Sequence, residues 1–265
     1  MYASILLFAL AGCTEHVEPP TARPIIPPVQ AWASLLDRAT ADGGVDWSLL
    51  ASQRATLDDM LGWYVDHGPE MRRVPEARED ERLASLLNVH NALVVDAVLR
   101  FVWSERADSR QLFVPVRELR EEKAFYVDAE WTTLKRLEEH RILAIFQDPE
   151  VLGGLYLGSA DGPRLRYWRP ETLRAVLKLG LLQWLERDGG MRRVGDGWAV
   201  TEALTEHARE FRDWAGAPNM CFALVEYTAN ERKRWLLDHL DDCPLQSFEP
   251  ENRLDGPTRG AQPMR

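Results

Sequence analysis

A serine and a histidine are the side chains in this sequence that could together perform acyl-transfer chemistry. Ser159 is the only hydroxyl in the loop 158–162 (GSADG), and His140 lies in an earlier segment with helical spacing. A serine activated by a histidine can attack an ester or amide carbonyl, so the two are candidate catalytic residues. No G-x-S-x-G turn surrounds Ser159. We therefore favour a turn-stabilising hydroxyl for Ser159 and a hydrogen-bonded core position for His140.

The most apolar stretch of the chain runs from Leu86 to Trp103 and predicts a buried core helix, although it also contains Asp96, Arg100 and three uncharged polar residues. They are Asn88, His90 and Asn91, and we name them as candidate pocket residues. Buried amides are costly unless they are hydrogen-bonded. The two asparagines, which share one helix face, either line a polar pocket or bond the backbone of an adjacent loop, and the sequence leaves both open. His90 lies within the apolar stripe of its own helix, where a core role is favoured.

The sequence predicts neither a metal site nor a cofactor. It lacks the HExxH pattern and any tight cluster of histidine and carboxylate residues. Its glycine pairs, Gly153-Gly154 and Gly189-Gly190, lack the context of a phosphate-binding loop. The formal net charge of −10 repels phosphates, so nucleic acid is not an expected partner. It also gives no attraction to anionic lipid, so membrane attachment must have another source.

The first dozen residues predict such a source. Residues 5–10 (ILLFAL) are apolar and lead into Leu10-Ala11-Gly12-Cys13, which has the pattern of a lipobox. The apolar run is too short to span a bilayer. We therefore predict a lipoprotein signal peptide at 1–12 and lipidation of Cys13, the alternative being a buried apolar element that happens to end in this pattern. Residue 14 is threonine rather than aspartate, which favours the outer membrane over retention at the inner one.

Two further cysteines, Cys221 and Cys243, are not spaced as a CxxC pair, so a zinc ribbon or a thioredoxin-type site is not expected. In an oxidising compartment they could form a disulfide. Two separate thiols are the other possibility, and the sequence does not decide between them.

Helical periodicity dominates the remaining chain, so we predict an α+β fold: a helix-rich single domain with a small sheet or hairpins. A proline-rich extended spacer is expected at 13–28, the globular domain at 29–248 and a disordered tail at 249–265. Apart from the core helix, the expected helices are Gln30–Ala39, Leu49–Asp66, Leu134–Phe146, Leu173–Leu185 after Pro170, and Val200–Trp214. The expected strands are Leu112–Val116, Ala124–Val127 and Leu155–Leu157, with a hairpin around Gly195-Asp196-Gly197.

Four segments occur in an order that resembles a known bacterial family. They are GVDW at 44–47 (after Leu35-Leu36), LNVHNAL at 87–93, LEEHRIL at 137–143 and GSADGPRL at 158–165. The set resembles the family called domain of unknown function 547, many of whose members are lipoproteins or secreted. The likeness covers most of Gln30 to Phe211.

The resemblance implies a loop cysteine and a helix histidine, the residue types of thiol catalysis, with an asparagine to orient the imidazole. In this chain the two loop cysteines of the family fall on Leu157 and Gly162. His140 matches the family's histidine if one residue is inserted between Leu134 and Glu139; otherwise Glu139 takes that place. Leucine cannot act as a nucleophile, so we expect the family fold without its thiol chemistry.

The sequence as a whole predicts a lipid-anchored protein of the cell envelope, on the periplasmic face of the outer membrane. Its expected role is binding or structural rather than catalytic. The expected partner is the membrane, through the lipid on Cys13, while a small-molecule or protein ligand is left open. The alternative is a hydrolase or an acyl-transferase-like enzyme that uses His140 with Ser159 or another nucleophile.

Overall fold

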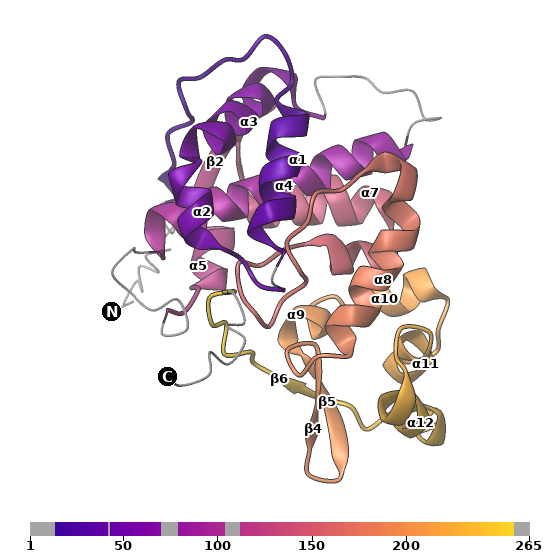
Figure 1. Ribbon diagram of the computed structural model, residues 1–265. Helices are drawn as coiled ribbons and strands as arrows, with labels where there is room; N and C mark the ends of the chain where they lie inside the picture. The colour runs from indigo at the N-terminus through magenta and orange to yellow at the C-terminus, as the bar shows by residue number, and fades with distance from the viewer. Residues whose placement is uncertain (1–13, 42, 70–78, 104–111, 257–265) are drawn as a thin grey trace, which may run out of the picture.

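The structure is a computed structural model, and it describes residues 14–41, 43–69, 79–103 and 112–256. It confirms the helix-rich α+β domain, with two small three-stranded sheets among the described residues. The first sheet lies with helices α1 to α7, while the second forms a projecting hairpin near helices α9 to α12 (Figure 1).

Helix α4 (Glu79–Phe101) is the central element, and α3 (Arg54–His67) lies against it (Figure 1). Three acidic residues in its first turn and Arg100 in its last turn complement the helix dipole. The helix is long and apolar enough to cross a membrane, but 83% of its apolar window is buried inside the protein. The expectation of a buried core helix is confirmed, because an all-round apolar surface needs neighbours on every side.

The first two helices of the chain pack on each other and on α3. The predicted helix 30–39 is confirmed as α1 (Val29–Ala39). The predicted helix 49–66 is two helices, α2 (Trp47–Ser52) and α3 (Arg54–His67), with a break at Gln53. The side chain of Asp46 caps α2 by accepting a hydrogen bond from the Leu49 amide at 2.9 Å.

The first sheet corrects the prediction of a free spacer at 13–28. Its strands, in the order β1-β2-β3, are β1 (Glu15–His16), β2 (Lys123–Val127) and β3 (Glu130–Thr133). β1 pairs in parallel with β2, and the next residue, Val17, is only 5% exposed. The prolines that suggest an extended spacer begin only at Pro19, so they leave these earlier backbone groups free to pair.

The predicted helix 134–146 is confirmed in extent but not in type. It consists of α6 (Leu134–Arg136), a π-helical segment η3 (Leu137–Leu143) and α7 (Ala144–Phe146). A 3₁₀ segment, η4 (Pro149–Gly154), follows and packs on α8 (Leu173–Leu185). A π-helical turn holds one more residue than an α-helical turn, which changes the side chains that face the core.

Two predicted strands are wrong. Leu112–Val116 contributes only an isolated bridge at Phe113, and helix α5 (Val116–Glu121) begins where the strand was expected to end. Leu155–Leu157 belongs to no sheet, because the amide of Tyr156 donates to the side chain of Asn91 instead of to a neighbouring strand.

The second sheet has the order β4-β5-β6, and its hairpin is confirmed. β4 (Met191–Val194) and β5 (Gly197–Thr201) are joined by a turn in which Gly195 has a φ of +59°, a backbone angle that suits glycine. β6 (Gln246–Phe248) pairs in parallel with β5. The helix expected from Val200 begins only at Glu202, after β5 ends at Thr201. A short 3₁₀ segment, η5 (Pro170–Thr172), precedes α8. The helices near the second sheet are α9 (Glu202–Thr205), α10 (Ala208–Ala215), α11 (Met220–Val225) and α12 (Asn230–Asp238).

Cys221 and Cys243 form a disulfide, with 5.6 Å between their Cα atoms. This decides between the two possibilities that the sequence leaves open. The bond joins α11 to the segment that follows α12.

The predicted disorder of 249–265 is wrong for residues 252–256, which form an ordered strap across the domain. The strap is bonded through its backbone: the amides of Val114 and Ala160 donate to its carbonyls at Asn252 and Arg253, both at 2.8 Å. The amide of Asp255 donates to the Gly158 carbonyl at 3.1 Å. Composition does not reveal such pairing, because it uses groups that every residue carries. Residues 257–265 lie outside the described part of the chain.

The strap predicts a stability effect at Leu254, which is 2% exposed. Leu254→Ala should lower the free energy of unfolding by about 2–4 kcal/mol, because truncating a buried leucine leaves a cavity. Urea denaturation followed by circular dichroism measures this. The control is Glu251→Ala, an exposed neighbour that should change stability by less than about 0.5 kcal/mol. An unchanged unfolding midpoint in Leu254→Ala would show that the strap is not docked.

Candidate functional site

Two of the three candidate pocket residues on α4, the asparagines, form hydrogen bonds to the backbone of the surrounding loops. The Asn88 amide donates to the Trp168 carbonyl and accepts from the Trp168 amide, both at 2.9 Å. The Asn91 amide donates to the Gly154 carbonyl at 3.3 Å and accepts from the Tyr156 amide at 3.2 Å. Of the two roles left open by the sequence, the asparagines therefore take the backbone-bonding one.

His90 is fully buried and both of its ring nitrogens have partners. Its Nδ1 lies 2.9 Å from Oδ1 of Asn91, and its Nε2 lies 2.8 Å from Oε1 of Glu138 on the π-helical segment η3. The Tyr156 amide can only donate and the Gly154 carbonyl can only accept, which fixes the orientation of the Asn91 amide. Both ring nitrogens thus face oxygen acceptors, and neither is available to activate an external nucleophile.

Glu138 connects His90 to Arg120 on α5. Its Oε2 lies 2.9 Å from Nε and 2.7 Å from Nη2 of Arg120, and Nη1 of Arg120 lies 3.3 Å from Oε2 of Glu206. Burial acts to raise the pKa of Glu138, but the hydrogen bond from His90 and the charges of His90 and Arg120 outweigh it and lower that pKa. Burial acts to lower the pKa of Arg120, and its two carboxylate partners raise it instead.

This polar chain ends at a cavity of about 460 Å³ between α5, α9 and the chain after β6. Arg120, Glu138 and Leu157 all line it. Among the described residues that line this cavity, none carries a hydroxyl or a thiol. Position 157, where the resemblance implies a cysteine, therefore holds an aliphatic side chain, and the buried carboxylate of Glu138 lines the same cavity.

The predicted catalytic pair is not brought together. His140 is exposed rather than part of the core, and it lines a separate hollow of about 550 Å³ together with Glu139, His207 and Trp214. Ser159 is 1% exposed beneath the strap and forms a bridge with Leu254. Its Oγ has no hydrogen-bond partner among the described residues, and the turn closes through the Gly162 amide and the Ser159 carbonyl at 3.2 Å. The expected roles, a core position for His140 and a turn-stabilising hydroxyl for Ser159, are both wrong.

Leu157 and Gly162, the two positions aligned with cysteines, are direct neighbours. A Cβ added to Gly162 would lie 3.1 Å from the Cβ of Leu157. The leucine side chain therefore occupies the space that a side chain at position 162 would otherwise share.

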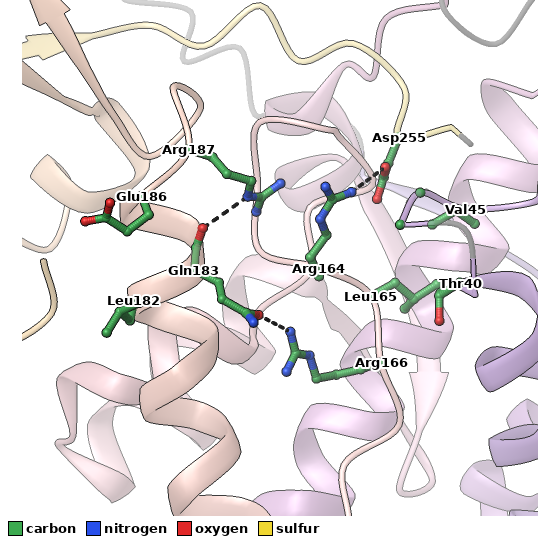
Figure 2. A pocket seen from close by; sticks show the side chains of 12 residues that line it. Thr40, Val45, Arg164, Leu165, Arg166, Leu182, Gln183, Glu186, Arg187 and Asp255 are labelled. Atoms are coloured by element: carbon green, nitrogen blue, oxygen red, sulfur yellow. Dashed lines mark hydrogen bonds and ion pairs between the residues drawn. The ribbon is translucent and has the colours of Figure 1, made fainter. Parts of the chain in front are cut away.

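A third cavity, of about 580 Å³, is lined by several arginines and was not anticipated from the sequence (Figure 2). Arg164 and Arg166 come from the extended segment before η5, Arg187 follows α8, and Asp255 comes from the strap. The spacing of Arg164 and Arg166, two residues apart on extended backbone, is the signal that could have revealed it, because such side chains share a face. Asp255 was hidden in the expected tail.

The chain could not be assigned to a family by similarity. Comparison with protein-family models, with curated proteins and with solved structures gives no match. Among the described residues, no group of three or more histidine, cysteine, aspartate and glutamate side chains could hold a metal ion.

The buried position of Glu138 predicts a pH-dependent loss of stability. Glu138→Gln should lower the free energy of unfolding at pH 7 by about 3–5 kcal/mol, because it leaves Arg120 and His90 without their shared carboxylate. The pKa of Glu138 is lower in the folded chain than its ordinary value of 4.5, so the native ion pair contributes fully above that pH. The difference between the two proteins should shrink as the pH falls through the folded pKa.

Urea denaturation at a series of pH values between 7 and 3 measures this difference. The matched control is Glu231→Gln, which removes the carboxylate of the exposed ion pair with Arg193. It should cost little at any pH. A constant difference between Glu138→Gln and the native protein across this range would contradict the assigned role of Glu138.

Proposed function

We propose that this protein is a lipid-anchored component of the cell envelope that acts by binding rather than by catalysis. The observation that carries the second half of the proposal is the wall of the cavity beside Glu138. There Leu157 lines the same cavity as a carboxylate already bonded to His90 and Arg120, and none of the described lining residues carries a hydroxyl or a thiol. A serine- or cysteine-type hydrolytic mechanism needs one of these groups as its nucleophile.

The resemblance to the domain of unknown function 547 supports this proposal in two ways. The one-residue insertion that aligns His140 with the family falls within or beside the π-helical segment η3, whose turn holds one extra residue. The two cysteine positions, Leu157 and Gly162, are in contact. Side chains at both positions would meet at a distance slightly below the Cβ–Cβ range of about 3.5–4.5 Å in disulfides, and a leucine opposite a glycine fills the same space without sulfur.

The non-catalytic role does not depend on which alignment is used. His140 and Glu139, the two residues that can match the family's histidine, both line the hollow on the outer side of η3. Leu157 lines the other cavity. Neither alignment brings a base next to position 157.

The proposed location is supported by the lipobox before Cys13 and by the disulfide. Structural disulfides persist in oxidising compartments such as the bacterial periplasm and are rare in the cytosol. Cys13 itself lies outside the described residues. Since β1 begins at Glu15, an anchor on Cys13 would hold the domain close to the bilayer rather than at the end of a long spacer.

The anchor predicts covalent lipid on Cys13. In a Gram-negative host grown with an alkyne-modified fatty acid, the native protein should take up the label and sediment with the outer membrane. Cys13→Ser should remain unlabelled and soluble, because acylation requires the thiol. The control, with both Cys221 and Cys243 changed to serine, should still be labelled. Label or membrane association that persists in Cys13→Ser would overturn the anchor.

The non-catalytic role predicts no turnover of ester, amide and peptide substrates by the Cys13→Ser protein. The control is Leu157→Glu, which places a charged side chain in the cavity. Both proteins should hydrolyse the substrates only at the background rate. Hydrolysis above this background that disappears in a folded His140→Ala or Ser159→Ala variant would establish an enzyme and refute the proposal.

A further inference from the structure

The arginine-lined cavity carries an excess of positive charge in an otherwise acidic protein. Arg164, Arg166 and Arg187 face it, and the chain as a whole has a net charge of −10. Figure 2 shows the guanidinium groups of Arg164 and Arg187 near each other, that of Arg166 below them beside Gln183, and Glu186 turned away from all three. The carboxylate of Glu186 is engaged elsewhere, by the Ala229 amide at 2.7 Å and by Arg232 at 3.6 Å.

Two of these arginines have no carboxylate partner among the described residues. Arg187 donates to the backbone carbonyls of Ala160 at 3.0 Å and Gly162 at 2.5 Å, which orient its guanidinium but do not neutralise it. Arg166 donates to the neutral side chain of Gln183 at 3.2 Å. Each guanidinium carries five N–H donors, so donors on both remain for a ligand.

The remaining arginine, Arg164, is paired with Asp255. Among the described lining residues, Asp255 is the only carboxylate that faces the arginines. Nη1 of Arg164 lies 3.4 Å from Oδ1 of Asp255. Burial raises the pKa of Asp255 to about 6, against the opposing effect of Arg164 and Arg187. Burial lowers the pKa of Arg187 to about 10, and the charge of Arg164 adds to that shift. Mutual repulsion among the arginines is therefore only partly relieved by the protein itself.

The geometry of the cavity limits the ligand further. Its other walls combine apolar side chains and glycine backbone, from Val45, Leu165, Leu182 and the pair Gly43-Gly44, with the neutral polar side chains of Thr40 and Gln183. Its volume is within the range of small-molecule sites. Three guanidiniums and one carboxylate leave about two uncompensated positive charges, which match the charge of a phosphate monoester better than that of a single carboxylate. The planar fork of arginine also fits phosphate oxygens.

We propose that this cavity binds a phosphate monoester carried on a small apolar group, recognised by Arg164, Arg166 and Arg187. The inference rests on the proposed binding role and names its ligand class. The phosphate belongs to a soluble metabolite or to the headgroup of a lipid, two sources with the same recognition chemistry.

Isothermal titration of the full-length Cys13→Ser protein with phenyl phosphate tests the site. Binding should be at least about ten-fold tighter than for benzoate, and phenol should not bind measurably, because the phosphate supplies most of the recognition. Arg166→Gln should weaken phenyl phosphate at least about ten-fold without unfolding the protein, since Arg166 bonds only a neutral side chain. Arg193→Gln, an exposed arginine on β4, is the matched control and should bind like the parent.

Vesicles of phosphatidylcholine with and without phosphatidic acid distinguish the two sources. Displacement of phenyl phosphate by phosphatidic acid vesicles alone identifies a lipid headgroup, and failure of displacement identifies a soluble monoester. The site is overturned if phenyl phosphate does not bind at millimolar concentration, if benzoate or phenol binds equally well, or if Arg166→Gln binds as tightly as the parent. None of these results would affect the labelling of Cys13 or the absence of turnover, so a failure here is distinguishable from a failure of the proposed function.

Discussion

Polar groups buried inside α4 have no access to water, and satisfying them determines where the surrounding chain must lie. Asn88 pairs with both backbone groups of Trp168, and Asn91 with those of Gly154 and Tyr156. An unsatisfied amide in this position would cost about 1–3 kcal/mol. Two side chains of a single helix thus position the loops on either side of the turn at 158–162. Leu157, just before this turn, lines one cavity, and Arg164, just after it, lines another.

The same helix connects this scaffold to the charged groups. His90, between the two asparagines in sequence, bonds Asn91 on one side and Glu138 on the other. Glu138 in turn binds Arg120. Each of these side chains already has a partner, so the cluster stabilises the fold.

The contrast between the two charged cavities follows from how their arginines are paired. Arg120 has two carboxylate partners, Glu138 and Glu206, and offers little net charge to a ligand. Arg166 and Arg187 are bonded to neutral oxygens. A guanidinium oriented by carbonyl groups keeps its charge, and a cavity lined by such groups attracts anions even in an acidic protein.

Local patterns in the sequence predict the elements that depend on local forces. Periodicity locates α8 and α1, and the glycines around Asp196 locate the hairpin. The polar residues in the core helix are also recognisable as a place where burial must be compensated. Pairings between distant segments escape the sequence, because β1 and the strap are bonded through backbone groups that every residue carries. The candidate pair His140 and Ser159 failed for the same reason: only the tertiary fold decides which faces meet. The arginine cavity was missed because one of its walls, Asp255, lies 91 residues after Arg164, the arginine that it pairs with.

The strap also orders the events of folding. Residues 252–256 bond Val114, Gly158 and Ala160, and the indole of Trp47 donates to the Asp255 carbonyl. Three regions of the chain therefore lack hydrogen-bond partners until a segment made much later arrives. During vectorial synthesis the N-terminal part emerges first, and it cannot complete its native structure alone. A polypeptide with this property remains incompletely folded until nearly the whole domain has been synthesised.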